Sequence, residues 1–493
     1  MRRIIVFLAS IGAAWSATLP AQERMPTPAP IPVASDGPIR PVSTRHSTQG
    51  PDGHIDYTGS FWEVPLKGTD GVDQATISAT AYVREGVGDR AARPVVVLFN
   101  GGPGASSSPL HFSAFGPKRL GARGSATAGS LADNPGTLLD VADLIFVDPV
   151  GTGFSRPLRE GGGKPYWTPE GDAASVLTLV RGWLRDQGRS ASPLFFAGES
   201  YGGYRIGVLA KQVADLNVRG LILISPALDF ATAADQAAIN ALPTMAIAAW
   251  HHGKVAREGR TAEAVWEAAR QFAQGDYAVA LQQGVLLPDA ERQRIAARIS
   301  ALIGLPAATI AAADLRVPTQ AFLEALVPGR IVGRLDVRVT APKPVPGSGP
   351  DRPAAANDPA LGLGRSNVIV SLPIGAYLRG PLGVASTRDY YSLTLDVNFN
   401  WDWRPPAPGP GESWSVVPNI ARLMEQKPAL RLLVVGGYYD LTVPLLGTRY
   451  ALSRGGIPLS RLRILPLAGG HSAFEEDVAN AVPVRDFIRS ASR

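Results

Sequence analysis

The sequence predicts an α/β fold built around a mostly parallel central sheet. Three short apolar segments, at residues 94–99, 144–147 and 195–198, each run directly into a glycine-containing turn. Continuous apolar runs of this length are typical of parallel strands that are buried on both faces. Strands and helices then alternate as far as residues 220–225, and a hydrophobic content of 45% over 493 residues is enough for a large core.

The turn after the third strand carries the most specific signal. Ser200 lies in Gly-Glu-Ser-Tyr-Gly (residues 198–202), where an apolar run stops and a helix-compatible run begins. A sharp strand-to-helix turn needs glycines beside the serine, and it lifts the hydroxyl towards substrate. This pattern is the nucleophile elbow of the α/β-hydrolase fold, with the Tyr201 N–H as one oxyanion donor. On this motif alone, an ordinary glycine-containing turn remains an alternative.

Two further glycine clusters support the elbow. The strand at 94–99 leads into Asn-Gly-Gly-Pro-Gly (residues 100–104), and the strand at 144–147 leads into Asp-Pro-Val-Gly-Thr-Gly-Phe-Ser (residues 148–155). In α/β-hydrolases the loop after the first of these strands supplies the second oxyanion N–H, which we assign to Gly102.

Taken together and in this order, the three motifs resemble the serine carboxypeptidase family (peptidase family S10). The resemblance extends from about residue 57 to the C-terminus, and its details are most similar to the bacterial branch. It implies an α/β-hydrolase fold with an inserted, largely helical cap over the site.

The nucleophile needs a base and an orienting acid, which in this fold follow in the order Ser, Asp or Glu, His. Of six histidines, only His471 comes after the sheet resumes at residues 430–435, and Asp440 follows that strand. In the family a serine, an aspartate and a histidine act from the positions that match Ser200, Asp440 and His471. Glu475 and Asp477 lie beyond the histidine, where we expect solvated or helix-capping roles.

The resemblance also implies how a free C-terminus is recognised. The family uses residues that match Asn100, Gly101 and Glu199, without a metal or cofactor, and Glu199 must be protonated to donate a hydrogen bond to a carboxylate. A structural role for Glu199 in the turn is the alternative. The chain departs from the family at Ala114, where many members carry a second glutamate, and at Ser472, where methionine is frequent.

The sequence also predicts a division of the chain. Residues 1–21 begin with Met-Arg-Arg and an apolar stretch too short to span a bilayer, which indicates a secretory signal peptide. Residues 22–54 form a proline-rich leader. The hydrolase domain follows in two parts, 55–228 and 414–493, and an alanine-rich helical cap occupies 229–413 between them.

Composition restricts the partners and the location. The net charge of +6 is dispersed without a dense Lys/Arg run, so we expect no nucleic-acid partner, and no apolar run is long enough for a membrane span. The chain has no cysteine, including at Ala105, where many family members have one. A periplasmic or secreted protein fits these features best, and the sequence does not indicate an oligomeric state.

We therefore expect a serine-type carboxypeptidase that hydrolyses the C-terminal bond of peptides through an acyl-enzyme on Ser200. A serine esterase or acyltransferase on the same scaffold is the alternative, and an inactive binding protein of this fold is a third hypothesis. No metal site is expected.

Overall fold

The computed structural model describes residues 29–121, 129–230, 232–344, 354–403 and 414–492. The predicted signal peptide, residues 1–21, lies outside these ranges, as does the start of the predicted leader.

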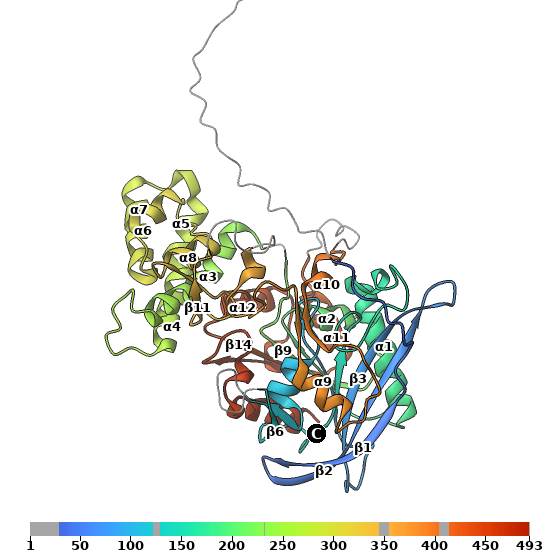
Figure 1. The fold of residues 1–493 in the computed structure, drawn as a ribbon. Coiled ribbons are helices and arrows are strands. Elements are labelled where there is room, and N and C mark those ends of the chain that lie inside the picture. Colours follow the sequence, from blue (N-terminus) through green and yellow to red (C-terminus); the bar gives the residue numbers. More distant parts are fainter. Residues whose placement is uncertain (1–28, 122–128, 231, 345–353, 404–413, 493) are drawn as a thin grey trace, which may run out of the picture.

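A nine-stranded sheet forms the centre of the molecule (Figure 1), in the order β1-β2-β3-β7-β4-β8-β9-β14-β15. The six strands from β7 to β15 are parallel to one another, while β1, β2 and β3 pair antiparallel and β3 joins β7 antiparallel. The α/β-hydrolase prediction is confirmed. The strands are β1 (Val42–Gly50), β2 (Gly53–Lys67), β3 (Asp73–Arg84), β4 (Val95–Phe99), β7 (Asp143–Asp148), β8 (Leu194–Glu199), β9 (Val218–Ile224), β14 (Arg431–Gly437) and β15 (Leu462–Leu467).

The first strand corrects the predicted leader. β1 lies inside the range 22–54, so the sheet begins at Val42 rather than after residue 54. Its sequence is mostly polar because it is an edge strand, paired only with β2, and most of its side chains are half-buried or exposed. Residues 75–83 belong to β3, which pairs antiparallel with β2 on one side and with β7 on the other.

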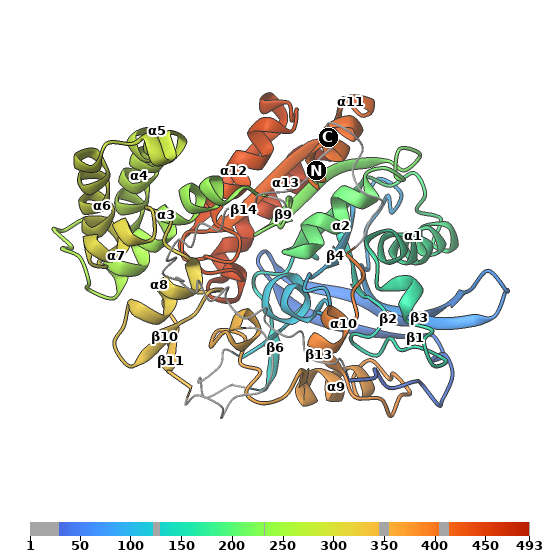
Figure 2. The same cartoon turned by 90° about the horizontal axis from the view of Figure 1, so that it is seen from above.

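Helices cover both faces of the sheet (Figure 2), and their apolar faces close two cores. One core joins the sheet to α1 (Pro169–Asp186), α2 (Tyr201–Leu209) and α11 (Val417–Gln426). The other joins it to the π-helix η1 (Pro109–Phe115) and to α13 (Val482–Ala491). This three-layer arrangement buries every residue of β4, β7 and β8, which explains their continuous apolar runs.

A large insertion separates β9 from β14. Its first part is a helical lobe with an apolar core of its own, seen in yellow-green in Figure 1. The lobe lies in the range 229–413, where an alanine-rich helical cap was predicted. The lobe contains α3 (Ala234–His251), α4 (Ala262–Phe272), α5 (Ala278–Gln283), α6 (Asp289–Ile303), α7 (Ala307–Ala312) and α8 (Thr319–Ala325).

The second part of the insertion consists of short strands and helices, among them two small antiparallel pairs, β10 with β11 and β12 with β13. The Gly153 and Ala105 loops each form a bridge with β13, so this part lies against the oxyanion-loop side of the body. Its elements are β10 (Arg330–Val332), β11 (Thr340–Pro342), β12 (Val368–Val370), α9 (Leu372–Arg379), β13 (Tyr391–Thr394) and α10 (Leu395–Phe399).

Candidate active site

Ser200 occupies the sharp turn between β8 and α2. Its backbone has φ 59° and ψ −122°, a conformation that is strained for any residue with a Cβ. The flanking glycines permit the turn, because a Cβ on Gly198 would lie 2.4 Å from the Gly202 oxygen, and one on Gly203 would lie 2.5 Å from Pro226 Cβ. The sequence therefore folds locally into a nucleophile elbow.

Asp440 and His471 meet at the carboxyl ends of two neighbouring strands. Asp440 follows β14, His471 follows β15, and Asp440 Oδ2 lies 2.7 Å from His471 Nδ1. Asp440 is fully buried, and its Oδ1 accepts hydrogen bonds from the N–H groups of Thr442 and Val443 at 2.8 and 3.0 Å. The carboxylate is thus fixed in position to hold the imidazole ring. His471 and Ser200 line one cavity.

A glycine loop packs directly against the elbow. A Cβ on Gly101 would lie 2.4 Å from the Tyr201 nitrogen, and Gly102 has φ 101°, in the region that favours glycine. Asp148, the first residue of the motif at 148–155, holds this loop. Its Oδ1 accepts hydrogen bonds from the Ser107 N–H at 2.8 Å and from the Ser107 hydroxyl at 2.7 Å. The predicted oxyanion residues, Gly102 and Tyr201, are therefore brought together.

A buried ion pair between Arg205 and Asp172 holds the loop that follows β4. Arg205 on α2 donates from Nε to Asp172 Oδ2 at 2.6 Å and from Nη1 to the Asn100 carbonyl oxygen at 2.8 Å. The side chains of Arg205 and Asp172 are 1% and 2% exposed. One guanidinium therefore connects α1, α2 and the loop that follows β4.

The cavity has a volume of about 1100 Å³. Asn100, Gly101 and Glu199 line it beside Ser200 and His471, so the predicted substrate-binding residues lie in one site with the predicted catalytic residues. Asn100 Oδ1 accepts from the Leu110 N–H at 3.2 Å, which fixes the direction of the side-chain amide. Glu199 is 5% exposed, and its Oε1 accepts from the Ser472 hydroxyl at 2.9 Å.

The charges of the site are coupled. Burial raises the pKa of Glu199 to about 7, against the opposing effects of His471, Ser472 and Asn100. Burial alone would lower the pKa of His471, but the negative charge and hydrogen bond of Asp440, with Glu199 adding to them, raise it to about 9. Each of the two groups therefore affects the protonation of the other.

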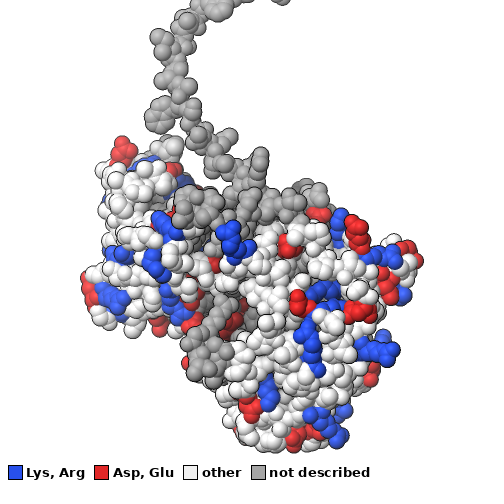
Figure 3. All heavy atoms as spheres, viewed as in Figure 1, with Lys and Arg blue, Asp and Glu red and all other residues white. Residues whose placement is uncertain are grey.

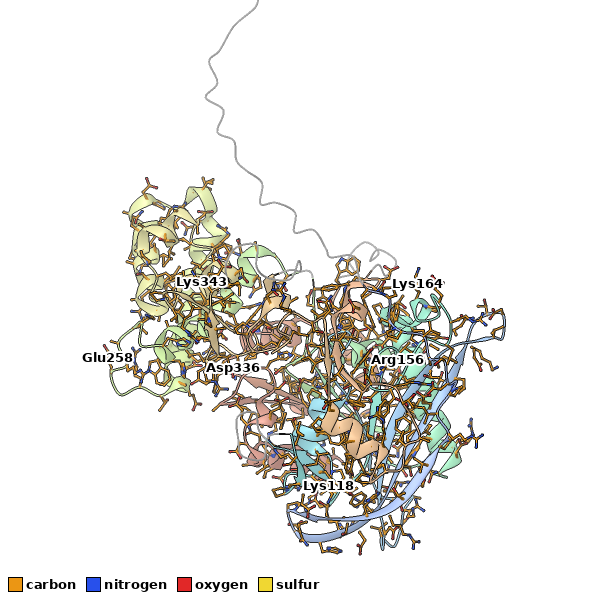
Figure 4. The ribbon with its side chains drawn as sticks, viewed as in Figure 1. Lys118, Arg156, Lys164, Glu258, Asp336 and Lys343 are labelled. Carbon is orange, nitrogen blue, oxygen red and sulfur yellow. The ribbon has the colours of Figure 1, made fainter. Side chains whose placement is uncertain are left out.

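A segment of the insertion reaches both catalytic loops. We call residues 334–339 the strap; Asp336, which it contains, is labelled in Figure 4. The Arg334 oxygen accepts from Leu441 N–H at 3.0 Å, and the Leu335 oxygen accepts from His471 N–H at 2.8 Å. Asp358 holds the strap, since its Oδ2 accepts from the N–H groups of residues 334 and 335 at 2.7 and 2.8 Å. Sequence reasoning missed this support, which has no local motif.

The two acidic residues beyond the histidine match the expectation, and one of them also reaches the site. Glu475, expected to be solvated or to cap a helix, is exposed but lines the cavity, and its negative charge acts on Glu199. Asp477 accepts from the Ala479 N–H at 2.8 Å and caps the short helix η8 (Val478–Ala481), as expected. The position of Glu475, four residues after the histidine, is the signal that could have identified it.

The described residues contain no group of three or more His, Cys, Asp or Glu side chains that could hold a metal ion. Within the same ranges, no helix is long and apolar enough to cross a bilayer. On the face seen in Figure 3, Lys and Arg side chains are interspersed with Asp and Glu.

Comparison with known proteins agrees with this geometry. The model of the serine carboxypeptidase family (Peptidase_S10) matches residues 82–262, which contain the glycine loop, the third motif and the elbow. Serine carboxypeptidase-like 36 of Arabidopsis thaliana is 32% identical over 147 residues, and pheromone-processing carboxypeptidase KEX1 of Paracoccidioides brasiliensis is 36% identical over 126 residues. Over residues 82–262 the chain is similar to the serine carboxypeptidase family.

These sequence matches are partial. They cover 28% and 25% of this chain, and they span 29% and 18% of the two relatives. The fold similarity is wider: the crystal structure of the prohormone-processing carboxypeptidase KEX1(Δ)P from Saccharomyces cerevisiae aligns with 88% of this chain and 91% of its own, at a TM-score of 0.56 and 15% identity. That likeness concerns the fold.

The two departures from the family pattern can now be placed. Ala114 is buried in η1 and supplies only a methyl group there. Ser472 follows the histidine and supplies the hydroxyl that contacts Glu199. His111, also on η1, is buried, lies 2.7 Å from the Tyr82 hydroxyl and stacks on Phe146, which gives it a structural role.

Proposed function

We propose that the protein is a serine-type carboxypeptidase, which hydrolyses the C-terminal peptide bond of peptides through an acyl-enzyme on Ser200. The observation that carries this proposal is the position of Glu199 and Asn100. Both line the cavity that also contains Ser200 and His471, and Glu199 is a buried acid whose pKa is raised to about 7. A protonated acid beside an amide is suited to bind a carboxylate without a metal.

The chemistry follows from the arrangement of the triad. His471 accepts the proton of Ser200 as the hydroxyl attacks the scissile carbonyl, and Asp440 holds the imidazole in the required tautomer. The N–H groups of Gly102 and Tyr201 stabilise the oxyanion, and each such donor contributes about 3 kcal/mol to lowering the barrier. His471 then protonates the leaving amine, and water hydrolyses the acyl-enzyme.

The coupling of Glu199 with His471 has a consequence for catalysis. With one proton on the pair, the higher pKa of His471 places that proton on the imidazole, where it blocks the base. A substrate carboxylate beside Glu199 favours the protonated form of Glu199. Protonation of Glu199 removes the negative charge that helps to raise the pKa of His471.

The remaining sequence predictions concern the location of the protein and the division of its chain. The charged and apolar N-terminal residues favour a secretory route, with the mature enzyme periplasmic or secreted, and the motif details favour the bacterial branch. We retain the division into two hydrolase parts around an inserted cap, with the start of the first part moved to Val42.

The test is hydrolysis of an N-blocked dipeptide and its C-terminal amide and ester analogues over a pH series, with Ser200→Ala as the blank. We expect a kcat/KM for the free acid that exceeds the amide value by at least about tenfold below pH 7, since a hydrogen bond to a charged group contributes about 1.5–3 kcal/mol. Equal rates on free and blocked substrates would instead indicate the esterase or acyltransferase activity.

A further inference from the structure

The carboxyl group of Glu199 accepts a hydrogen bond from the Ser472 hydroxyl at 2.9 Å, and Asn100 lines the cavity beside it and lowers its pKa. Among the charged side chains, His471, which is paired with Asp440, and Glu475 have the largest effects on the pKa of Glu199. The other charged side chains that line this cavity are Arg119, Arg334, Asp336, Asp358 and Glu476. Ser472 and Glu475 belong to the turn that follows the catalytic histidine.

That turn is rigidly held. Ser472 precedes the short helix η7 (Ala473–Glu475), and its carbonyl oxygen accepts from the Glu475 N–H at 2.9 Å. Arg119 donates from Nη2 to the Phe474 and Glu475 carbonyl oxygens at 3.3 and 2.5 Å. Phe474 packs on Phe115 of η1, with ring centroids 4.8 Å apart. The hydroxyl of Ser472 and the charge of Glu475 therefore keep a defined relation to Glu199.

The residues of the helix η1 that line the cavity, Pro109, Phe112 and Ser113, are not titratable. Its residue Ala114 has no polar side-chain atom, and the Ala114 carbonyl oxygen accepts from Asn134. His111 of η1 is buried away from the cavity lining and bonded to Tyr82. No titratable group of η1 is therefore among the partners given above.

We propose that Ser472 and Glu475 jointly set the pH range in which the chain recognises a C-terminal carboxylate, by acting in opposite directions on the protonation of Glu199. A hydroxyl that donates to a carboxylate favours the ionised form, whereas a neighbouring negative charge disfavours it. This inference rests on the proposed role of Glu199 as the carboxylate-binding acid. It assigns Ser472 and Glu475 as positioning residues, which act on substrate through Glu199.

The directions of the pKa effects agree with the geometry. Burial is the largest cause that raises the pKa of Glu199, Glu475 raises it further, and the Ser472 hydrogen bond lowers it. Removing the hydroxyl should therefore keep Glu199 protonated to higher pH. Removing the Glu475 charge should let it ionise at lower pH.

The experiment measures kcat/KM against pH for an N-blocked dipeptide and its C-terminal amide, with wild type, Ser472→Ala and Glu475→Gln. The alkaline limb is the part of the profile in which kcat/KM falls as the pH rises. For the free acid, Ser472→Ala should move this limb to higher pH by about one unit, the size expected for a hydrogen bond to a charged group. Glu475→Gln should move it down by about half a unit, because Glu475 is exposed and screened. The amide profile should move less than the free-acid profile in either variant, because it depends on Glu199 only through His471.

Asp477→Asn is the matched control. It removes a carboxylate of similar exposure two residues further on, outside the cavity lining, and asparagine keeps the helix cap. Its free-acid limb should coincide with that of wild type. If Ser472→Ala fails to fold, the result for Glu475→Gln tests the inference alone. This variant should fold, because an exposed side chain is replaced by one of the same shape.

The outcomes separate this inference from the proposed function. The inference fails if the alkaline limb of the free-acid pH profile stays in place in Ser472→Ala and Glu475→Gln. It also fails if that limb moves in the same direction in both variants. Glu199→Gln tests the proposed function on its own: if it lowers activity on the free acid and the amide equally, carboxylate recognition by Glu199 fails. If it affects the free acid alone while the two turn variants match wild type, the function stands and the inference fails.

Discussion

The buried pair of Arg205 and Asp172 gives a prediction whose magnitude follows from the structure. Arg205 makes two contacts to the carboxylate, at 2.6 and 3.3 Å, and one to the Asn100 carbonyl oxygen, at 2.8 Å. Its guanidinium also lies 4.9 and 5.1 Å from the ring centroids of Phe99 and Tyr201. Arg205→Met fills a similar volume but leaves the carbonyl without this donor and the carboxylate without its cation, with the Tyr201 hydroxyl at 3.3 Å from Asp172 Oδ2.

The expected loss of stability is large. Removing one partner of a buried ion pair costs about 3–5 kcal/mol, because the remaining charge is left unpaired. Replacing both partners by apolar residues is often neutral, so R205M/D172L should recover most of that cost. Activity should fall as well, since a displacement of about 1 Å in a positioned loop can cost about 100-fold in rate.

Urea denaturation at pH 7 measures the stabilities, and kcat/KM on a free-acid dipeptide measures the activity. Arg181→Met is the control, because its ion pair with Asp215 is 44% and 59% exposed and should contribute less than about 1 kcal/mol. A cost below about 1 kcal/mol for Arg205→Met, or a double variant that shows the sum of the single losses, would refute the reasoning.

Four further predictions follow from the site and its supports. Ser200→Ala should remove nearly all turnover in a folded protein, and wild-type rates would exclude it as the nucleophile. Asp440→Asn should lower kcat by about 10⁴-fold, and adding His471→Ala should lower it little further, whereas additive losses would argue against a triad. Gly102→Ala should reduce kcat/KM, because φ is 101° and the new Cβ would meet a backbone nitrogen at 2.7 Å, while an unchanged value would show that the loop is adaptable. Burial holds the pKa of His111 well below its usual value. Below about pH 6.5 the imidazole therefore binds a proton in the unfolded chain but not in the folded one, and the free energy of unfolding falls by up to about 1.4 kcal/mol for each unit by which the pH is lowered. His111→Phe should remove that part of the slope in urea denaturation between pH 7 and 5, and an identical slope would contradict it.

The sequence predicted the parts of the site that depend on short motifs. The elbow needs glycines at fixed offsets from Ser200, and the fold orders the acid and the base, so Asp440 could be selected by its place after a resumed strand and His471 by elimination. Their side chains do meet at 2.7 Å. The alternation of apolar runs likewise revealed the parallel strands, because buried strands carry that signal locally.

What the sequence did not reveal depends on contacts between distant segments. The strap reaches the His471 loop over more than a hundred residues, and Asp358 holds it through backbone N–H groups, which leave no side-chain pattern. Glu475 is exposed, as expected, and only the fold of the turn shows that it also lines the cavity. β1 was missed because an edge strand needs no apolar alternation.

The most direct test of the central claim is the product pattern on a peptide of about ten residues with a free C-terminus. Mass spectrometry of timed samples should show the successive loss of single residues from that end with the wild-type protein. The amidated peptide should stay largely intact, and Ser200→Ala should leave both peptides intact. Cleavage at internal bonds, or equal degradation of the free and amidated peptides, would contradict a serine carboxypeptidase that recognises the terminal carboxylate through Glu199.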